Sequence, residues 1–443
     1  MSEAYVAGTL EVGDGPGGGP LGALTALGAR WEPGRPALAR SGRGKVNSHV
    51  HLPPNFSAFS TVVEATELAS AQGVGVLGAS NYYDFGVYGP FAERSRSVGV
   101  FPLFGLEVVC LLDDLRQAGE RVNDPGNPGK MYLCGKGLTR FAPMSPAAAQ
   151  LMGTVRSIDS DRIAAMIEKL GRILAAGGVE TSVTEASLKA AVMSRYGVPA
   201  EAVFLQERHV AQAFQEALFA AVPNGALPGV LGAIFGAVAG LDPGAVSVQN
   251  AIRTHLMKAG KPGYVEESFV GFDHAYRLVL ALGGVPCYPV LADGARPICE
   301  FERPVERLVA SLRQRRIHCA ELIPNRNVPT VLGDYVQALR SAGIAVLAGT
   351  EHNTPDMLPM EPQCVAAEPI PEDLKEIFWE GACVIAAHQF LTANGKSGYV
   401  DDHGEPNGSY GDGDARIKAF AEIGAAVIEQ YSAMAGPHPV VSR

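Results

Sequence analysis

The sequence lacks paired cysteine motifs, and this absence excludes two kinds of site. Its seven cysteines are odd in number and scattered, and none forms a Cys-x-x-Cys pair. Neither a structural zinc ribbon nor a thioredoxin-like centre is therefore predicted. Several cysteines lie in apolar stretches such as "GGVPCYPV" and "GACVIAAH", which is typical of reduced core residues in a cytoplasmic protein.

The sequence also lacks a long apolar run and an excess of positive charge. No apolar stretch reaches the ~18 residues of a membrane span, and the N-terminal "MSEAYVAGTLEV" has no basic segment before an apolar one. The formal net charge of -10 disfavours the phosphate backbone of nucleic acid as the main partner. We expect a cytoplasmic protein with neither a membrane nor a nucleic acid as its partner.

Apolar strands and helical periods alternate along much of the chain. The 443 residues are 47% hydrophobic and 19% charged, which is typical of a globular protein with a large core. "VGVLGAS" and "VGVFPLFGLEVVC" are expected to be strands, and "STVVEATELASAQG" a helix. This alternation predicts an α/β fold with a parallel sheet and crossover helices, arranged as a barrel.

The pattern changes in the middle of the chain, where "SDRIAAMIEKLGRILAAGG", "VTEASLKAAVMSRYG" and "ERHVAQAFQEALFAAV" are amphipathic helical segments without a strand of comparable strength between them. The alternation then resumes. We predict an extended lead-in over residues 1–44, the first part of a barrel over 45–143, a helical insertion over 144–265, the second part of the barrel over 266–400, and a C-terminal helical extension over 401–443.

Two histidines open the barrel sequence. The stretch "KVNSHVHLPPNF" places His49 and His51 one residue apart at the end of an apolar alternation. Side chains two apart in a strand point to the same face, so both rings converge on one side of the sheet. Imidazole is the commonest metal ligand in proteins, and this pair is a candidate for part of a metal site.

Further polar side chains follow the other apolar runs. Active sites of βα barrels lie at the C-terminal ends of the strands. Histidines, carboxylates and amides recur there, which favours a metal site built from several strand ends. These residues are Asn47, Ser80, Asn81, Tyr82, Asp84, Glu107, Tyr288, Asn325, Arg326, Asn327, Glu351, His352 and Asn353.

The order of these motifs resembles the PHP (polymerase and histidinol phosphatase) superfamily of metal-dependent hydrolases, over residues of about 45–140 and 180–355. "NSHVHL" is similar to the opening His-x-His, "VGVFPLFGLEVV" to the Gly-x-Glu strand, and "QERHVAQAFQEAL" to a helix of members with a helical insert. "YVQALRSAGIAVLAGTEHN" resembles the closing motif. The resemblance implies a distorted PHP-like barrel with a helical insertion. It also implies a hydrolase, and among hydrolases it favours a phosphoesterase.

The resemblance also implies a site and a cofactor. One or two divalent ions of Zn, Mn or Fe are expected, and a small, anionic molecule is the expected substrate. Glu351 or Glu107 would accept the proton of a metal-activated water. The candidate metal ligands are His49, His51, Glu107, His209, Glu351 and His352.

The sequence departs from the family pattern in the closing motif, where His352 directly follows Glu351 instead of lying two residues on, and at four further positions. Tyr82, Tyr132 and Tyr288 stand where the pattern has histidine, and Asn81 stands where it has aspartate. A neutral phenol offers a hydrogen bond in place of a strong coordinate bond. We therefore expect the three tyrosines to line the pocket and contact substrate or water around at most two ions.

"IPNRNVPT" places Arg326 between Asn325 and Asn327 at a strand end. Its guanidinium is a candidate clamp for a phosphate or carboxylate of the substrate, and Asn353 is a further candidate contact. The alternatives are that Arg326 extends into solvent and that Asn353 caps the next helix.

Two other functions stay open at this point. The first is a mononuclear hydrolase or isomerase that acts on a sugar acid, with Arg326 holding the carboxylate of its substrate. The second is a barrel that has lost catalysis and binds a ligand, since an incomplete motif weakens a functional prediction.

Overall fold

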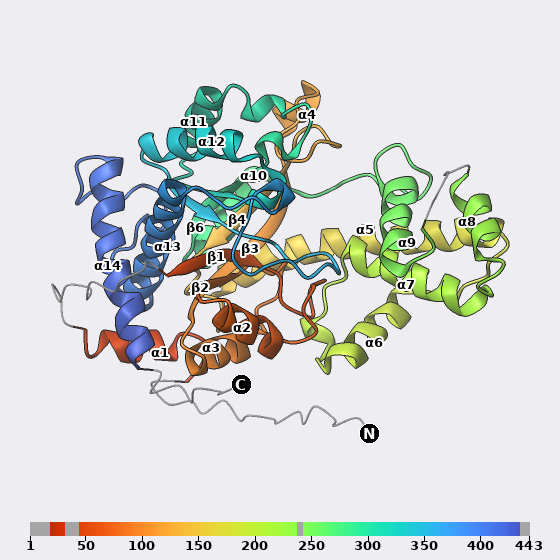
Figure 1. Ribbon diagram of the computed structural model, residues 1–443, viewed down its shortest axis with the longest axis horizontal. Coiled ribbons are helices and arrows are strands. Elements are labelled where there is room, and N and C mark those ends of the chain that lie inside the picture. The colour runs from red at the N-terminus through yellow and green to blue at the C-terminus, as the bar shows by residue number, and fades with distance from the viewer. Residues whose placement is uncertain (1–17, 32–43, 237–241, 435–443) are drawn as a thin grey trace. The chain divides into compact units, whose positions relative to one another are not determined.

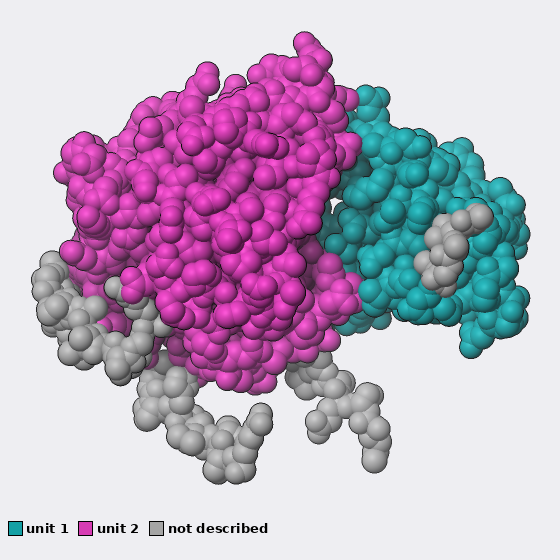
Figure 2. Space-filling view, turned by 45° about the horizontal axis from the view of Figure 1, so that its top comes forward, with its two compact units in different colours: residues 1–7, 53–57, 153–270 teal, residues 8–52, 58–152, 271–443 magenta. Residues whose placement is uncertain are grey.

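The computed structural model describes residues 18–31, 44–236 and 242–434, and the chain divides into two compact units. One unit is helical and contains residues 53–57 and 153–270. The other contains the sheet and comprises the described parts of residues 8–52, 58–152 and 271–443; we call it the barrel unit (Figure 2). All seven cysteines are free and buried, in agreement with their apolar surroundings. Among the described residues, no helix has the length and apolarity to cross a membrane.

The strands form one sheet in the order β1-β2-β3-β4-β6-β7-β8, with β5 paired to β3. Neighbouring strands are parallel except that β4 is antiparallel to both β3 and β6. The strands are β1 (Lys45–Val50), β2 (Val74–Ala79), β3 (Phe101–Leu111), β4 (Lys130–Lys136), β5 (Val270–Gly271), β6 (Val285–Val290), β7 (Cys319–Leu322) and β8 (Ala345–Ala348).

Hydrogen bonds across the ends of β1 and β8 bring the edges of the sheet together. The backbone N–H groups of Thr350 and Glu351 both donate to the carbonyl oxygen of His49, at 3.1 and 2.8 Å, and the N–H of His51 donates to the carbonyl of Glu351 at 2.8 Å. The sheet is thus a nearly closed barrel in which parallel pairs predominate. The predicted barrel with a helical insertion is confirmed, and the antiparallel β4 is its main distortion.

Helices cover the outside of the barrel, so its strands are buried on both faces. All eleven residues of β3 are buried, as is typical of a strand with apolar cover on each side. Figure 1 shows α2 and α3 beside β2, and α13 and α14 side by side. The helices of this unit are α1 (Gly22–Gly28), α2 (Val62–Ala71), α3 (Tyr88–Ser97), α4 (Asp113–Gln117), α10 (Phe272–Ala281), α11 (Val305–Gln314), α12 (Pro329–Ser341), α13 (Glu372–Ala393) and α14 (Gly413–Ala433).

The helical unit has a core of its own. On α7 the apolar residues Val210, Phe214 and Leu218 recur every four residues and are fully buried, because this spacing places them on one face of a helix. Its helices are α5 (Pro146–Ala176), which begins in the barrel unit, α6 (Glu185–Tyr196), α7 (Glu207–Ala221), α8 (Leu227–Phe235) and α9 (Ala245–Ile252), followed by one π-helical turn (Arg253–Met257).

The ends of the chain differ in part from the sequence prediction. The predicted extended lead-in contains the helix α1, whose Leu24 and Leu27 are buried. Within the predicted lead-in, residues 1–17 and 32–43 lie outside the described part of the chain. The predicted C-terminal helical extension contains α14, and residues 435–443 lie outside the described part.

Candidate metal centre

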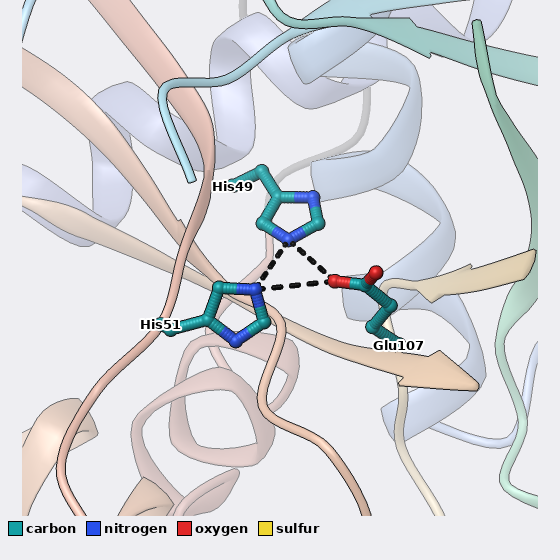
Figure 3. Close-up of side chains that lie close together, drawn as sticks. All are labelled: His49, His51 and Glu107. Carbon is teal, nitrogen blue, oxygen red and sulfur yellow. Dashed lines mark hydrogen bonds and ion pairs between the residues drawn. The ribbon is translucent and has the colours of Figure 1, made fainter. Parts of the chain in front are cut away.

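Three side chains of metal-ligating types meet where the end of β1 lies near the interior of β3. His49 is on β1, His51 is the first residue after β1, and Glu107 is on β3. His49 Nε2 lies 3.3 Å from His51 Nε2 and 3.3 Å from Glu107 Oε2, and His51 Nε2 lies 3.1 Å from the same oxygen. The three residues are 1%, 0% and 5% exposed. Figure 3 shows the two rings and the carboxylate turned toward one another.

The spacing of these donor atoms fits a divalent ion. Two ligands that bind one tetrahedral ion at about 2.0–2.1 Å lie roughly 3.3 Å from each other, close to the separations in this group. Glu107 Oε2 is buried, and apart from the two imidazole nitrogens that face it, it has no hydrogen-bond partner. Two imidazoles and a carboxylate suit Zn, Mn or Fe. His49, His51 and Glu107 can therefore hold one such ion.

Glu321 on β7 fixes the orientation of the His49 ring. The Nδ1–H of His49 donates to Glu321 Oε2 at 2.6 Å, which leaves the lone pair on Nε2, the atom that faces His51 and Glu107. A carboxylate in this position holds the tautomer of a ligating histidine and raises its basicity. Glu321 was not predicted as a site residue, although a carboxylate in the middle of the apolar "IHCAELIP" indicates a buried, partnered group, because glutamate is rarely buried without a partner.

Lys136 at the end of β4 neutralises Glu321. Its Nζ lies 2.8 Å from Glu321 Oε1, and both side chains are almost inaccessible to solvent. Ser48 Oγ donates to the same oxygen at 2.6 Å. Burial alone raises the pKa of Glu321, but Lys136 and His49 outweigh burial and lower it to about 2. Lys136 was not predicted as a site residue either, since it lies at the end of the apolar "MYLCGK".

Tyr82 contacts the second oxygen of Glu107. Its hydroxyl donates to Glu107 Oε1 at 2.6 Å, and its ring stacks on His51 with the centroids 5.2 Å apart. Burial and the charge of Glu107 raise the pKa of Tyr82 well above its usual value, so the phenol stays neutral. Burial opposes the charge of Glu107, but its contacts with His49 and His51 hold the pKa of this carboxyl well below its usual range.

Tyr132 shares the face of β4 that carries Cys134. In the β3–β4 register Cys134 pairs with Glu107, and Tyr132, two residues away, pairs with Val109. Asn123 holds the backbone of Tyr132, since its amide accepts from Tyr132 N–H at 2.9 Å and donates to the Tyr132 carbonyl at 3.0 Å. Tyr132 thus lies on the same face of the sheet as Glu107, and its predicted contact with substrate stays a prediction.

Glu351 lies beside the centre and pairs with Arg326. Glu351 Oε2 accepts hydrogen bonds from Arg326 Nη2 and, at 2.7 Å, from Asn353 Nδ2. Its backbone has a left-handed φ of 61°, which is uncommon for a residue with a side chain and costs energy. Gly349 before it passes so close to His49 that an added Cβ would lie 2.4 Å from the His49 Cβ. The Glu351 side chain is 12% exposed and that of Arg326 is 41% exposed.

His352 takes a structural position in this turn. Asn47 Nδ2 donates to Thr350 Oγ1 at 2.7 Å, and the Thr350 hydroxyl lies 2.6 Å from His352 Nδ1. The other ring nitrogen lies 3.0 Å from the carbonyl of Leu358. Protein groups therefore engage both nitrogens of His352, and this corrects its predicted role as a ligand in the described arrangement.

Tyr288 also departs from its predicted place. In the β6–β7 register Pro289 pairs with Glu321, and Tyr288 pairs with Ala320, so Tyr288 points to the face opposite that of Glu321. Its hydroxyl donates to Glu302 Oε1 at 3.0 Å. The three tyrosines are therefore not gathered around one pocket, because the alternation of strand β6 turns the Tyr288 ring toward the helices.

The two asparagines beside Arg326 differ in their surroundings. Asn327 is buried, and its amide donates to the Leu291 carbonyl and to Asp293 Oδ1, both at 3.0 Å. These bonds hold the amide nitrogen of Asn327, while its Oδ1 is buried without a hydrogen-bond partner. Asn325 lies in the short 3-10 turn Pro324–Arg326, and its Oδ1 is likewise buried without a hydrogen-bond partner. A contact of either asparagine with substrate stays a prediction.

His209 belongs to the helical unit. Its Nδ1 accepts the backbone N–H of Gln206 at 3.1 Å, and its ring contacts Phe56 edge-on. Burial, with a smaller effect of Arg195, lowers the pKa of His209 to about 3. One ring nitrogen thus caps the first turn of α7, and a role for His209 as a metal ligand stays a prediction.

Comparison with known proteins supports the fold. No protein-family model matches the sequence, and no curated protein matches it. The chain is similar to the structure of an amidohydrolase from Chromobacterium violaceum with bound sulfate and no metal, at a TM-score of 0.50 and 17% identity over 75% of this chain and 96% of that one. It is also similar to a protein from Bifidobacterium adolescentis provisionally described as a metal-dependent phosphoesterase, at a TM-score of 0.48 and 13% identity over 76% and 96%.

Proposed function

We propose that the protein is a metal-dependent hydrolase of the PHP type that cleaves small phosphate esters. One observation carries the proposal: His49, His51 and Glu107 bring three donor atoms to within 3.1–3.3 Å of one another in the interior of the barrel. A divalent ion held there supplies Lewis acidity, which polarises the scissile bond and acidifies a water molecule. The barrel shared with an amidohydrolase is compatible with this class of reaction.

The protein holds the ligands in place before any ion binds. Glu321 fixes the tautomer of His49, and Tyr82 fixes the carboxylate of Glu107. His49 Nε2 and Glu107 Oε2 then face the same point without a change of rotamer. Such preorganisation raises metal affinity, because partners of the ligands are oriented in advance.

Glu351 is the proton acceptor in this proposal. Glu107 is unsuited to the role, since one oxygen accepts from Tyr82 and the other faces the two histidines. The backbone of Glu351 bonds directly to those of His49 and His51, and Arg326 and Asn353 orient its carboxylate. A carboxylate in that position takes the proton of the attacking water as general base.

Arg326 provides the contact for an anionic substrate. A guanidinium has five N–H donors in a planar fork, and the Nη2 of Arg326 is the donor that contacts Glu351. The other donors suit the oxygens of a phosphate, for which arginine has the matching geometry. The partial exposure of this side chain makes the guanidinium accessible to a substrate. Asn325, Asn353, Tyr82 and Tyr132 are the further candidate contacts.

A substrate panel tests the proposal. The protein is stripped with a chelator, reloaded with Zn, Mn or Fe, and assayed for release of inorganic phosphate from phosphomonoesters, and for hydrolysis of phosphodiesters and lactones. We expect metal-dependent hydrolysis of phosphate esters. Lactone hydrolysis without phosphate release would support the sugar-acid alternative, and no turnover with any metal would support the ligand-binding barrel.

A matched pair of variants tests the role of Glu351. Glu351→Gln should lower kcat at least a hundredfold with little change in metal content, as expected for loss of a general base. Glu405→Gln is the control, because Glu405 forms a comparable pair with the exposed Arg316 at 3.2 Å. Equal kcat values in the two variants would exclude Glu351 as the base.

A further inference from the structure

Lys136 has all its ammonium hydrogens bonded inside the barrel. The side chain is 1% exposed. Its Nζ donates to the carbonyl of Ser48 at 3.1 Å, to Ser80 Oγ at 3.0 Å and to Glu321 Oε1 at 2.8 Å. An ammonium group has three hydrogens and no acceptor, so these three bonds use all of its hydrogen-bond donors without solvent.

This ammonium lies beside a second group of donors that could hold a cation. A ring nitrogen of His49, the sulfur of Cys134 and a carboxylate oxygen of Glu321 lie within 4.8 Å of one another, and all three residues are buried. Lys136 Nζ is 2.8 Å from Glu321 Oε1 and 3.4 Å from His49 Nδ1. An ion bound by this group would therefore face a positive charge at short range, where repulsion is strong.

We propose that the Lys136 ammonium takes the place of a second metal ion, so that the chain binds one divalent ion, held by His49, His51 and Glu107. The proposal rests on the function proposed above for that first ion. The Nδ1–H of His49 already donates to Glu321, so no lone pair on that atom is available to a second ion. Lys136 neutralises Glu321, so Glu107 is the one carboxylate of this group left without a counter-charge, and a single dication already exceeds its charge. A second dication would add positive charge that no carboxylate of this group offsets.

Metal stoichiometry tests the inference. The full chain is stripped with a chelator, loaded with excess Zn²⁺ or Co²⁺, desalted and analysed for metal per chain. We expect one ion per wild-type chain and two per chain for Lys136→Met, since without the ammonium a second dication can displace the Nδ1 proton of His49 and bind that nitrogen, Cys134 and Glu321. Lys130→Met is the matched control: Lys130 is a buried lysine on the same strand, pairs with Asp124 at 3.1 Å, and its loss should leave one ion.

A second variant and a spectrum keep the test decisive if Lys136→Met unfolds. Lys136→Met/Glu321→Gln removes both buried charges and should bind one ion. Co²⁺-loaded wild type should show no thiolate-to-cobalt absorption band, whereas folded Lys136→Met should gain one from Cys134. Two ions or a thiolate band in the wild type, or one ion in folded Lys136→Met, would overturn the inference alone. No bound ion in the wild type would overturn the proposed function and the inference together.

Discussion

The Tyr82 hydroxyl donates to Glu107 Oε1 at 2.6 Å, so a phenol holds the carboxylate whose other oxygen faces His49 and His51. Tyr82 stands where the PHP pattern that the sequence resembles has a histidine. In this chain the position therefore supports a ligand through a hydrogen bond instead of supplying a ligand. A hydrogen bond to a charged group contributes about 1.5–3 kcal/mol, which is enough to affect metal affinity.

Tyr82→Phe should weaken metal binding about tenfold, because Glu107 Oε1 loses its donor and the carboxylate is less firmly held. The dissociation constant for Zn²⁺, measured by competition with a chromophoric chelator, checks this. Tyr410→Phe is the control, since the Tyr410 ring packs on Phe420. An unchanged constant for Tyr82→Phe would show that the hydroxyl has no part in holding the ligand.

Glu321→Gln should lower metal affinity by about 10–100-fold, the usual effect of losing a group that orients a ligating histidine. Glu321→Asp should recover part of the loss if its carboxylate still reaches His49 Nδ1. The same chelator competition measures both variants, with thermal unfolding followed in parallel. A loss of stability with full metal affinity would assign Glu321 to the fold alone.

Arg326→Lys should raise KM for a phosphate ester about tenfold with a smaller change in kcat. Lysine keeps the charge but loses the planar fork that binds a phosphate with two hydrogen bonds. The exposed Arg316, which pairs with Glu405, gives the control variant Arg316→Lys. Equal KM values for the two variants would remove Arg326 from the substrate site.

The barrel strands were predictable from sequence, whereas the direction of β4 was not. Apolar runs bounded by glycine and helical periods predicted β2, β3 and β6–β8. The stretch that forms β4 has the same pattern whether it runs parallel or antiparallel to its neighbours, since side chains alternate in both cases. Its antiparallel pairing is therefore a result of tertiary structure alone.

His49, His51 and Glu107 were found because each follows an apolar run in the sequence, although the structure places Glu107 inside β3 and not at its end. Lys136 and Glu321 were missed because each adjoins apolar residues, at the end of β4 and within β7, and the two are 185 residues apart. Tyr288 was misplaced for a related reason. Both faces of a barrel strand are apolar, so the sequence does not tell which face is inside.

We predict that the free energy of unfolding depends on pH through the buried carboxyl of Glu302, which is not part of the metal centre. Burial outweighs the hydrogen bonds from Leu291 N, Ala292 N and Tyr288 and raises the pKa of Glu302 from 4.5 to about 7. The folded state therefore binds a proton that the unfolded state has lost between pH 4.5 and 7. Stability is highest below this window and falls by about 3 kcal/mol as pH rises through it. Urea unfolding at pH 5 and pH 8 should show this loss for wild type and a smaller one for Glu302→Gln. Equal pH dependence in the two proteins would contradict it.

The central claim is that His49, His51 and Glu107 hold one divalent ion, and anomalous diffraction tests it most directly. Crystals of the full chain grown with Zn²⁺ are measured on both sides of the zinc absorption edge. We predict one strong anomalous peak per chain at about 2.0–2.2 Å from His49 Nε2, His51 Nε2 and Glu107 Oε2, and none between Cys134 and Glu321. A map without a peak between the two histidines and Glu107 would contradict the account.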